Sequence, residues 1–233
     1  MWGINCWQTV SGNVVICSHK FQMKRKERYD TVINHFQVNI PEAETELLYD
    51  NPFQLLVAVI LSAQCTDTNV NNVTKDIYKK YYTPKHFADL GITKIKRMIK
   101  SIGLFNMKAK NLYNLSKILV EKYQSKVPNN FEDLINLPGV GRKTANVVLN
   151  AAFNKPTIAV DTHVFRVSNR TGLTKGKNPN QVEEQLLKIL PNKYLKKAHH
   201  LILLHGRYTC KSRNPLCTKC VINKICLYKD KNV

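Results

Sequence analysis

Apolar positions along most of the chain recur at helical spacing. The segments LYNLSKILVEKY (112–123), QVEEQLLKIL (181–190) and LKKAHHLILLHG (195–206) place apolar residues three or four positions apart, which keeps them on one face of a helix. PTIAV (156–160) is the segment that resembles a strand, and one short strand cannot form a sheet. We therefore predict an all-α fold of about seven to ten helices. Gly206 is expected to end the last of the three quoted helices as its C-cap.

The most apolar segment, FQLLVAVILSAQ (53–64), is predicted to be a buried helix. Asn51 and Pro52 precede it, and asparagine as N-cap with proline in the first turn favours a helix start. Apolar residues all round the helix are typical of one that lies inside a core. No apolar run in the sequence reaches the roughly 18 residues that a membrane-spanning helix needs.

The charge of the chain indicates a polyanionic partner. Its 233 residues carry 36 lysines and arginines against 16 acidic residues, a formal net charge of +20, and 43% of them are hydrophobic. That length and hydrophobic content suit one large or two modest domains with a real core. The excess of positive charge favours binding to phosphates. Charge alone leaves nucleic acid and an anionic membrane surface both open.

Residues 1–22 differ in composition from the rest of the chain. They hold both tryptophans, a single lysine and no acidic residue, and Met23 follows at the start of MKRKERYD. A continuous apolar stretch of signal-peptide length is absent from them. We expect these residues to be a poorly ordered extension or a mis-assigned start.

Four of the seven cysteines lie in the last 24 residues, with the spacing C-x6-C-x2-C-x5-C. Four thiolates this close in sequence can surround one tetrahedral metal ion or the corners of an iron–sulfur cubane. The clustering argues against a spread disulfide framework and for a metal site in a reducing compartment such as the cytoplasm. The spacing leaves zinc and a 4Fe–4S cluster open as occupants of a site formed by Cys210, Cys217, Cys220 and Cys226.

The stretch LPGVGRKTANVV (137–148) predicts a tight turn that leads into a helix at about Arg142. Gly139 and Gly141 allow positive φ and leave backbone N–H groups uncovered, which suits a phosphate. Lys143 lies in the first helical turn, where the helix dipole and the neighbouring Arg142 both disfavour a charged ammonium group. An amine nucleophile must lose that charge. From the residue alone, a simple phosphate contact by Lys143 stays open.

Asp161 precedes another amphipathic helix in VDTHVFRV (160–167). Aspartate in that position is most often an N-cap. A capping carboxylate is held rigidly, so it can also stabilise positive charge on a sugar or carry a proton. The two roles are compatible.

Together these segments resemble the endonuclease III family of bifunctional DNA glycosylases. LPGVGRKTANVVLN resembles its helix–hairpin–helix, VDTHVFRV the segment with its aspartate, and the cysteines its 4Fe–4S loop; LSAQCTD (61–67) and IGLFNMKA (102–109) match two further family segments. The likeness runs from about residue 24 to residue 230, in order. It implies two helical domains: a six-helix barrel with the helix–hairpin–helix over 45–156, and a 4Fe–4S cluster domain formed by 23–44 and 157–233.

The resemblance implies a monomeric base-excision enzyme that acts on double-stranded DNA with damaged pyrimidines or abasic sites. Lys143 would attack the anomeric carbon, and a Schiff base with β-elimination would nick the strand 3′ to the lesion, with Asp161 assisting. Gln64 would fill the space left by the flipped base, and Leu104 would wedge into the opposite strand, although a core leucine is the alternative for Leu104. Contacts with DNA are expected from Gln64, Leu104, Gly139, Val140, Gly141, Arg142, Thr144 and His163.

Three rival functions remain at this point. An adenine-mismatch glycosylase shares the fold and cluster but usually lacks a lysine at position 143 and carries an extra C-terminal domain. A pyrimidine-dimer glycosylase shares the same motifs. A non-catalytic DNA-binding protein would use the hairpin and basic surface alone, and the presence of both Lys143 and Asp161 argues against it.

Overall fold

The computed structural model describes residues 23–232. Within that range the chain forms ten α-helices, one short 3-10 helix and no strand, which confirms the all-α prediction. The segment 156–160 runs between two helices without regular secondary structure. The predicted extension, residues 1–22, lies outside the described residues. No helix in the described range is long and apolar enough to cross a membrane.

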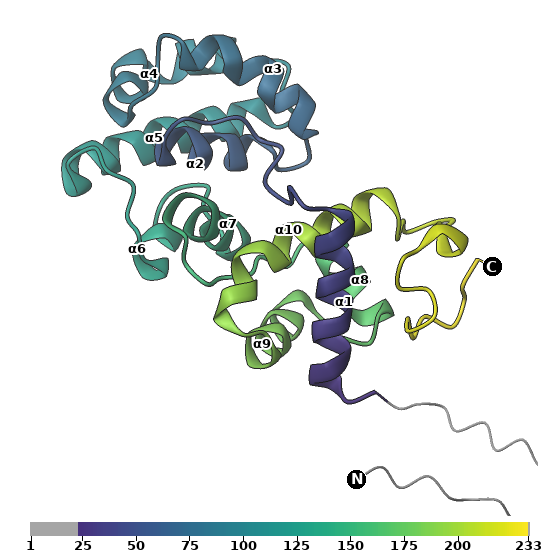
Figure 1. The fold of residues 1–233 in the computed structure, drawn as a ribbon. Helices are drawn as coiled ribbons and strands as arrows, with labels where there is room; N and C mark the ends of the chain where they lie inside the picture. The colour runs from purple at the N-terminus through teal and green to yellow at the C-terminus, as the bar shows by residue number, and fades with distance from the viewer. Residues whose placement is uncertain (1–22, 233) are drawn as a thin grey trace, which may run out of the picture.

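Six consecutive helices form the first unit, which we call the barrel domain (Figure 1). Proline in the first turn and a side-chain cap begin α2 and α4, and α4 is broken at Gly91, whose φ is +71°. The helices of the barrel domain are α2 (Pro52–Leu61), α3 (Asp67–Tyr78), α4 (Pro84–Met98), α5 (Phe105–Tyr123), α6 (Phe131–Ile135) and α7 (Arg142–Phe153).

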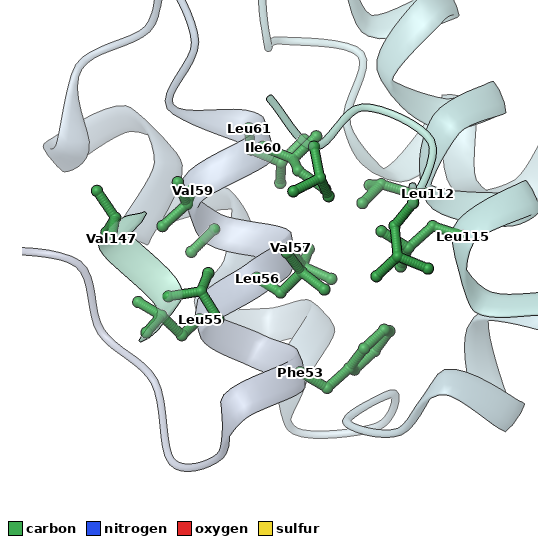
Figure 2. Close-up of a cluster of buried hydrophobic side chains, with 14 of the residues drawn as sticks. Phe53, Leu55, Leu56, Val57, Val59, Ile60, Leu61, Leu112, Leu115 and Val147 are labelled. Atoms are coloured by element: carbon green, nitrogen blue, oxygen red, sulfur yellow. The ribbon is translucent and has the colours of Figure 1, made fainter. Parts of the chain in front are cut away.

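Helix α2 lies at the centre of the barrel domain. Asn51 accepts a hydrogen bond from the Gln54 N–H at 3.0 Å, the expected N-cap, and every residue from position 53 to 61 is buried. Figure 2 shows its apolar side chains between Val147 of α7 on one side and Leu112 and Leu115 of α5 on the other. Burial of each such side chain contributes about 1.5–3 kcal/mol. The prediction of a core helix is confirmed for residues 53–61, whereas the expected last residues, Ala63 and Gln64, lie exposed in the turn that follows.

The second unit joins the two ends of the described chain, and we call it the terminal domain. Figure 1 shows α1, from the start of the chain, beside α9 and α10, with the cysteine loop at the outer end. Its helices are α1 (Arg25–Asn39), α8 (Thr162–Arg170), α9 (Pro179–Ile189), α10 (Asn192–Tyr208) and the 3-10 helix η1 (Cys217–Lys219).

Buried apolar side chains divide into two cores. One runs from Leu47 to Ala159, and the other combines Tyr29 to Ala43 with Ile158 to Ile222. The chain therefore passes from one core to the other within the segment 156–160. This division supports the predicted domain boundaries, which stay a prediction.

Gly206 does not end its helix, contrary to our expectation. Helix α10 continues to Tyr208, and a Cβ on Gly206 would lie 2.9 Å from Val167 Cγ2 and 3.0 Å from His163 Cβ. Gly206 therefore lets α10 approach α8 closely. This approach brings the residues around Asp161 and those of α10 together.

Candidate active site and cysteine centre

The turn before α7 is a hairpin in which the side chain of Val140 is buried in the core of the barrel domain. Gly139 has a φ of +81°, whereas Gly141 is the N-cap of α7 with an extended φ of −98°. Positive φ is thus needed only at the first glycine. Val140 donates its N–H to the Leu137 carbonyl at 3.0 Å and buries its side chain. Val140 therefore anchors the hairpin from within, and the exposed backbone of the turn belongs to its glycine neighbours.

Lys143 and Asp161 line one pocket between the two domains, the central pocket. Lys143 is exposed in the first turn of α7, and Asp161 is the N-cap of α8, where Oδ1 accepts the Val164 N–H at 2.8 Å. The predicted N-cap is therefore present. Gln64 and Thr144 line the same pocket. Four of the predicted site residues, from three separate segments, thus converge on one space.

A seam of buried amides ties the Lys143 helix to the segment that ends at Asp161. Asn146 and Asn150 lie on the buried face of α7. The Asn146 side chain donates to the Ile158 carbonyl at 3.4 Å, and the Asn146 backbone carbonyl accepts a hydrogen bond from Thr157 Oγ1 at 2.8 Å. Asn150 donates to the Thr157 carbonyl at 2.7 Å. Buried polar groups that are satisfied in this way fix one arrangement, so these bonds fix the segment that leads to Asp161 relative to the helix that carries Lys143.

Two buried histidines of α10, which no motif in the sequence marks, form another part of the pocket wall. His199 Nδ1 lies 2.8 Å from the Ala159 carbonyl. Burial lowers the pKa of His199, with a further decrease from Lys143, while Asp161 and the Ala159 hydrogen bond oppose the shift. Burial lowers the pKa of His200 to about 3. Both rings are therefore neutral at pH 7, and His199 lies within the electrostatic reach of both predicted catalytic residues.

An ion-pair network closes one side of the central pocket. Arg207 of α10 bonds to Asp67 at the start of α3, with Nη1 and Oδ2 2.9 Å apart, and also to Glu46 in the connection that precedes α2. Tyr208 donates to Glu46 Oε1 at 2.6 Å. The network joins the terminal domain to the barrel domain. Asp67 belongs to the LSAQCTD motif, which was the available sequence signal, whereas Glu46 and Arg207 carried none.

Arg142 makes the second charged link between the domains. Its Nε and Nη2 donate to the two carboxylate oxygens of Glu183 in α9, at 3.0 and 2.8 Å, and its guanidinium lies 5.2 Å from the Phe131 ring centre. The hydrogen bond with Glu183 raises the pKa of Arg142. Because a carboxylate balances its charge, Arg142 repels the neighbouring Lys143 ammonium less than the sequence alone indicated.

Gln64 and Leu104 are the two exposed tips of adjacent loops. Both have left-handed backbone conformations, with φ of +55° and +59°. Leu104 is 52% exposed, so it is not a core leucine. Left-handed backbone is uncommon for residues other than glycine and occurs often at functional sites.

His163 and Leu104 do not line the central pocket. His163 lies half-buried on α8, with Nδ1 3.1 Å from Arg166 Nη2. Arg166 also donates to the carbonyls of Cys210 and Gly206, at 3.0 and 2.9 Å. His163 thus lies between the Asp161 end of α8 and the cysteine loop.

The four C-terminal cysteines line one apolar pocket of the terminal domain. Burial raises the pKa of Cys220 and of Cys226, and the charges of Cys210 and Cys217 raise both further. Cys220 and Cys226 therefore both lie within electrostatic reach of Cys210 and Cys217. Among the described residues, no three histidine, cysteine or acidic side chains are arranged to hold a single metal ion.

Basic and aromatic side chains surround the cysteine pocket. Arg170 Nη1 lies 3.7 Å from Cys210 Sγ and donates to the Lys211 carbonyl at 2.7 Å, and its guanidinium stacks 4.2 Å from the Tyr228 ring centre. His205 Nε2 lies 3.7 Å from Cys220 Sγ. Arg170 thus places an N–H donor and a positive charge next to a cysteine sulfur, which suits a site of negatively charged thiolates.

Comparison with known proteins agrees with this architecture. Residues 57–192 match the family model described as "HhH-GPD superfamily base excision DNA repair protein". Endonuclease III of Rickettsia conorii is 58% identical over 83% of this chain and 92% of its own length, and that of Escherichia coli K12 is 49% identical over 90% and 99%. A solved structure of a trapped endonuclease III–DNA covalent intermediate is 43% identical, with a TM-score of 0.82 over 86% of this chain and 95% of that one. The chain therefore belongs to the endonuclease III family, within the HhH-GPD superfamily of base excision DNA repair proteins.

Proposed function

We propose that this DNA glycosylase removes oxidised or ring-damaged pyrimidines and cleaves the strand at the resulting abasic site, with Lys143 as nucleophile and Asp161 as the assisting carboxylate. The observation that carries the proposal is the convergence of both side chains on the central pocket between the domains. Lys143 lies in the first turn of α7, and Asp161 is held as the N-cap of α8. The seam of Asn146 and Asn150 holds those two places together.

In the proposed reaction, the neutral amine of Lys143 attacks the anomeric carbon, and the bond from that carbon to the damaged base breaks. The base leaves with the bonding electron pair and takes up a proton. Asp161 stabilises the positive charge that develops on the sugar. The amine then loses a proton, and its lone pair forms the C=N bond of a Schiff base as the bond from C1′ to the ring oxygen O4′ breaks and O4′ takes up a proton. The Schiff base permits loss of a proton from C2′ and rupture of the 3′ carbon–oxygen bond, whose electron pair leaves with the 3′ phosphate. Hydrolysis of the Schiff base frees the enzyme.

The hairpin and the loop tips are the proposed DNA contacts. The turn at Gly139 and Gly141 presents backbone N–H groups at the N-terminus of α7, which suits a phosphate, and the net charge of +20 favours a polyanion. Gln64 and Leu104 project from neighbouring loops and suit insertion into a duplex from which a nucleotide is extruded. The bacterial endonuclease III relatives support a cytoplasmic location for this activity.

We also propose that Cys210, Cys217, Cys220 and Cys226 hold a 4Fe–4S cluster. The fit rests on four thiols around one apolar pocket, with Arg170 beside Cys210 to offset negative charge. When bound, such a cluster stabilises the loop and can exchange an electron. Metal analysis and visible absorbance test the assignment. A brown protein with about four irons per chain supports it, and a colourless protein with stoichiometric zinc contradicts it.

Borohydride trapping tests the catalytic proposal. The wild-type chain should form a covalent adduct with a duplex that contains thymine glycol, and Lys143→Ala should not. Duplexes with a cyclobutane pyrimidine dimer or an adenine mismatch identify the rival specificities. If neither damaged nor abasic duplexes give an adduct, a released base or a cut strand while DNA is still bound, the non-catalytic alternative is correct.

A further inference from the structure

The loop that contains Gln64 and the loop that contains Leu104 are far apart in the sequence but contact each other. A side chain on Gly103 would begin 3.6 Å from the Gln64 carbonyl oxygen, so the two backbones are close neighbours. Asn69 donates to the Ser101 carbonyl at 3.4 Å and to Cys65 Sγ at 3.2 Å. The left-handed backbone at both tips is strained for a residue with a side chain. Contacts within the protein must therefore hold these conformations.

Lys108 of α5 contacts both loops. Its side-chain ammonium donates to the carbonyls of Leu61 and Ala63, at 2.9 and 2.6 Å, immediately before Gln64. Its backbone N–H makes the first helical hydrogen bond of α5, to the Leu104 carbonyl at 3.1 Å, so the Lys108 side chain extends from the helical turn that begins at the Leu104 tip. Lys108 therefore links the segment just before Gln64 to the first turn of α5, which begins after Leu104.

The placement of Lys108 is unusual for a lysine, because the residue is only 2% exposed. Its amine lies at the C-terminal end of α2, where carbonyls lack intrahelical partners and the helix dipole is negative. The Cys65 N–H bonds to Ser62 and does not continue the helix. Burial lowers the pKa of Lys108, and nearby Cys65 opposes that shift. Burial of an amine is costly unless it is hydrogen-bonded, and the carbonyls of Leu61 and Ala63 supply those bonds.

We propose that Lys108 is a positioning residue that sets the spacing of the Gln64 and Leu104 tips, so that both enter the duplex together when a nucleotide is extruded. The inference rests on the proposed function, because it assigns those tips to the DNA. Lys108 touches neither the substrate nor the reacting atoms. Its effect is therefore confined to steps in which a duplex must be opened.

Cleavage of two abasic substrates by Lys108→Met tests the proposal. Methionine keeps the unbranched stem but cannot donate hydrogen bonds. Lys110→Met is the matched control, because Lys110 is exposed on the same helix and loses the same charge. We expect Lys108→Met to be slower than the control by about tenfold or more on an abasic duplex. On a single-stranded abasic oligonucleotide, which needs no extrusion, the two variants should agree within about twofold.

Two results would overturn the role of Lys108: an unchanged rate on the duplex, or an equal loss on both substrates. A wild-type chain that cleaves neither substrate counts against the proposed function and not against Lys108. The double variant Lys108→Met with Gln64→Ala adds a second criterion, because residues that act together give non-additive effects. If Lys108→Met fails to fold, Asn69→Ala, which removes the other bond between the loops, is measured on the same two substrates with the same expected difference.

Discussion

The ion pair between Arg142 and Glu183 should respond very differently to loss of each partner. The Glu183 side chain is 7% exposed, whereas that of Arg142 is 50% exposed. Arg142→Met leaves a buried carboxylate without its cation, a loss that costs about 3–5 kcal/mol of unfolding free energy. Glu183→Gln leaves a guanidinium that water can solvate and an amide that still accepts one hydrogen bond, so it should cost about 1 kcal/mol.

Urea unfolding followed by circular dichroism measures the asymmetry, with Glu184→Gln as control because the neighbouring Glu184 is exposed. That control should stay within about 0.5 kcal/mol of the wild type. Equal costs for Arg142→Met and Glu183→Gln, or a cost below about 1 kcal/mol for Arg142→Met, would refute the reasoning. The pair would then behave as an ordinary surface salt bridge and would not fix the two domains.

Three further changes test other parts of the structure. Asn150→Ala removes one of the two buried amides of the seam and should cost about 2 kcal/mol in urea unfolding; unchanged stability would contradict a stabilising role for the Asn150 hydrogen bonds. His200 has a pKa lowered to about 3 and titrates near 6.5 when unfolded, so its stabilisation is present above that value and is lost as the pH falls. Acidification from about pH 7 to pH 5 should cost about 2 kcal/mol through this group, and His200→Gln should weaken the pH dependence; an equal dependence in both chains would contradict the assignment. Gly206→Ala should destabilise by about 1–3 kcal/mol through contact with Val167 and His163, whereas a gain in thermal stability would show that helix propensity decides.

Local sequence signals were sufficient to locate the start of α2. The pair Asn51 and Pro52 predicts the start of α2 because cap and proline chemistry act within one turn, and α2 begins at Pro52. A C-cap glycine and a glycine at a helix–helix contact look alike in sequence. Gly206 was therefore assigned wrongly, since its role depends on how close α8 lies.

The site residues that belong to a sequence motif were predictable. Those that reach the site only through tertiary packing were not. Lys143 and Asp161 belong to motifs with recognisable local chemistry. His199 and Arg207 lie on α10 and reach the central pocket only because the two domains pack together. Lys108 resembles any surface lysine in the sequence, and only the carbonyls at the end of α2 reveal its buried position.

Mass spectrometry of the trapped complex tests the central claim most directly. After borohydride reduction with an abasic duplex and digestion of protein and DNA, the added sugar mass should lie on Lys143 in the peptide that spans the start of α7. The wild-type chain and the Lys108→Met variant should carry the adduct at the same residue. An adduct on any other lysine, or on the terminal amine, would contradict the assignment of Lys143 as the nucleophile.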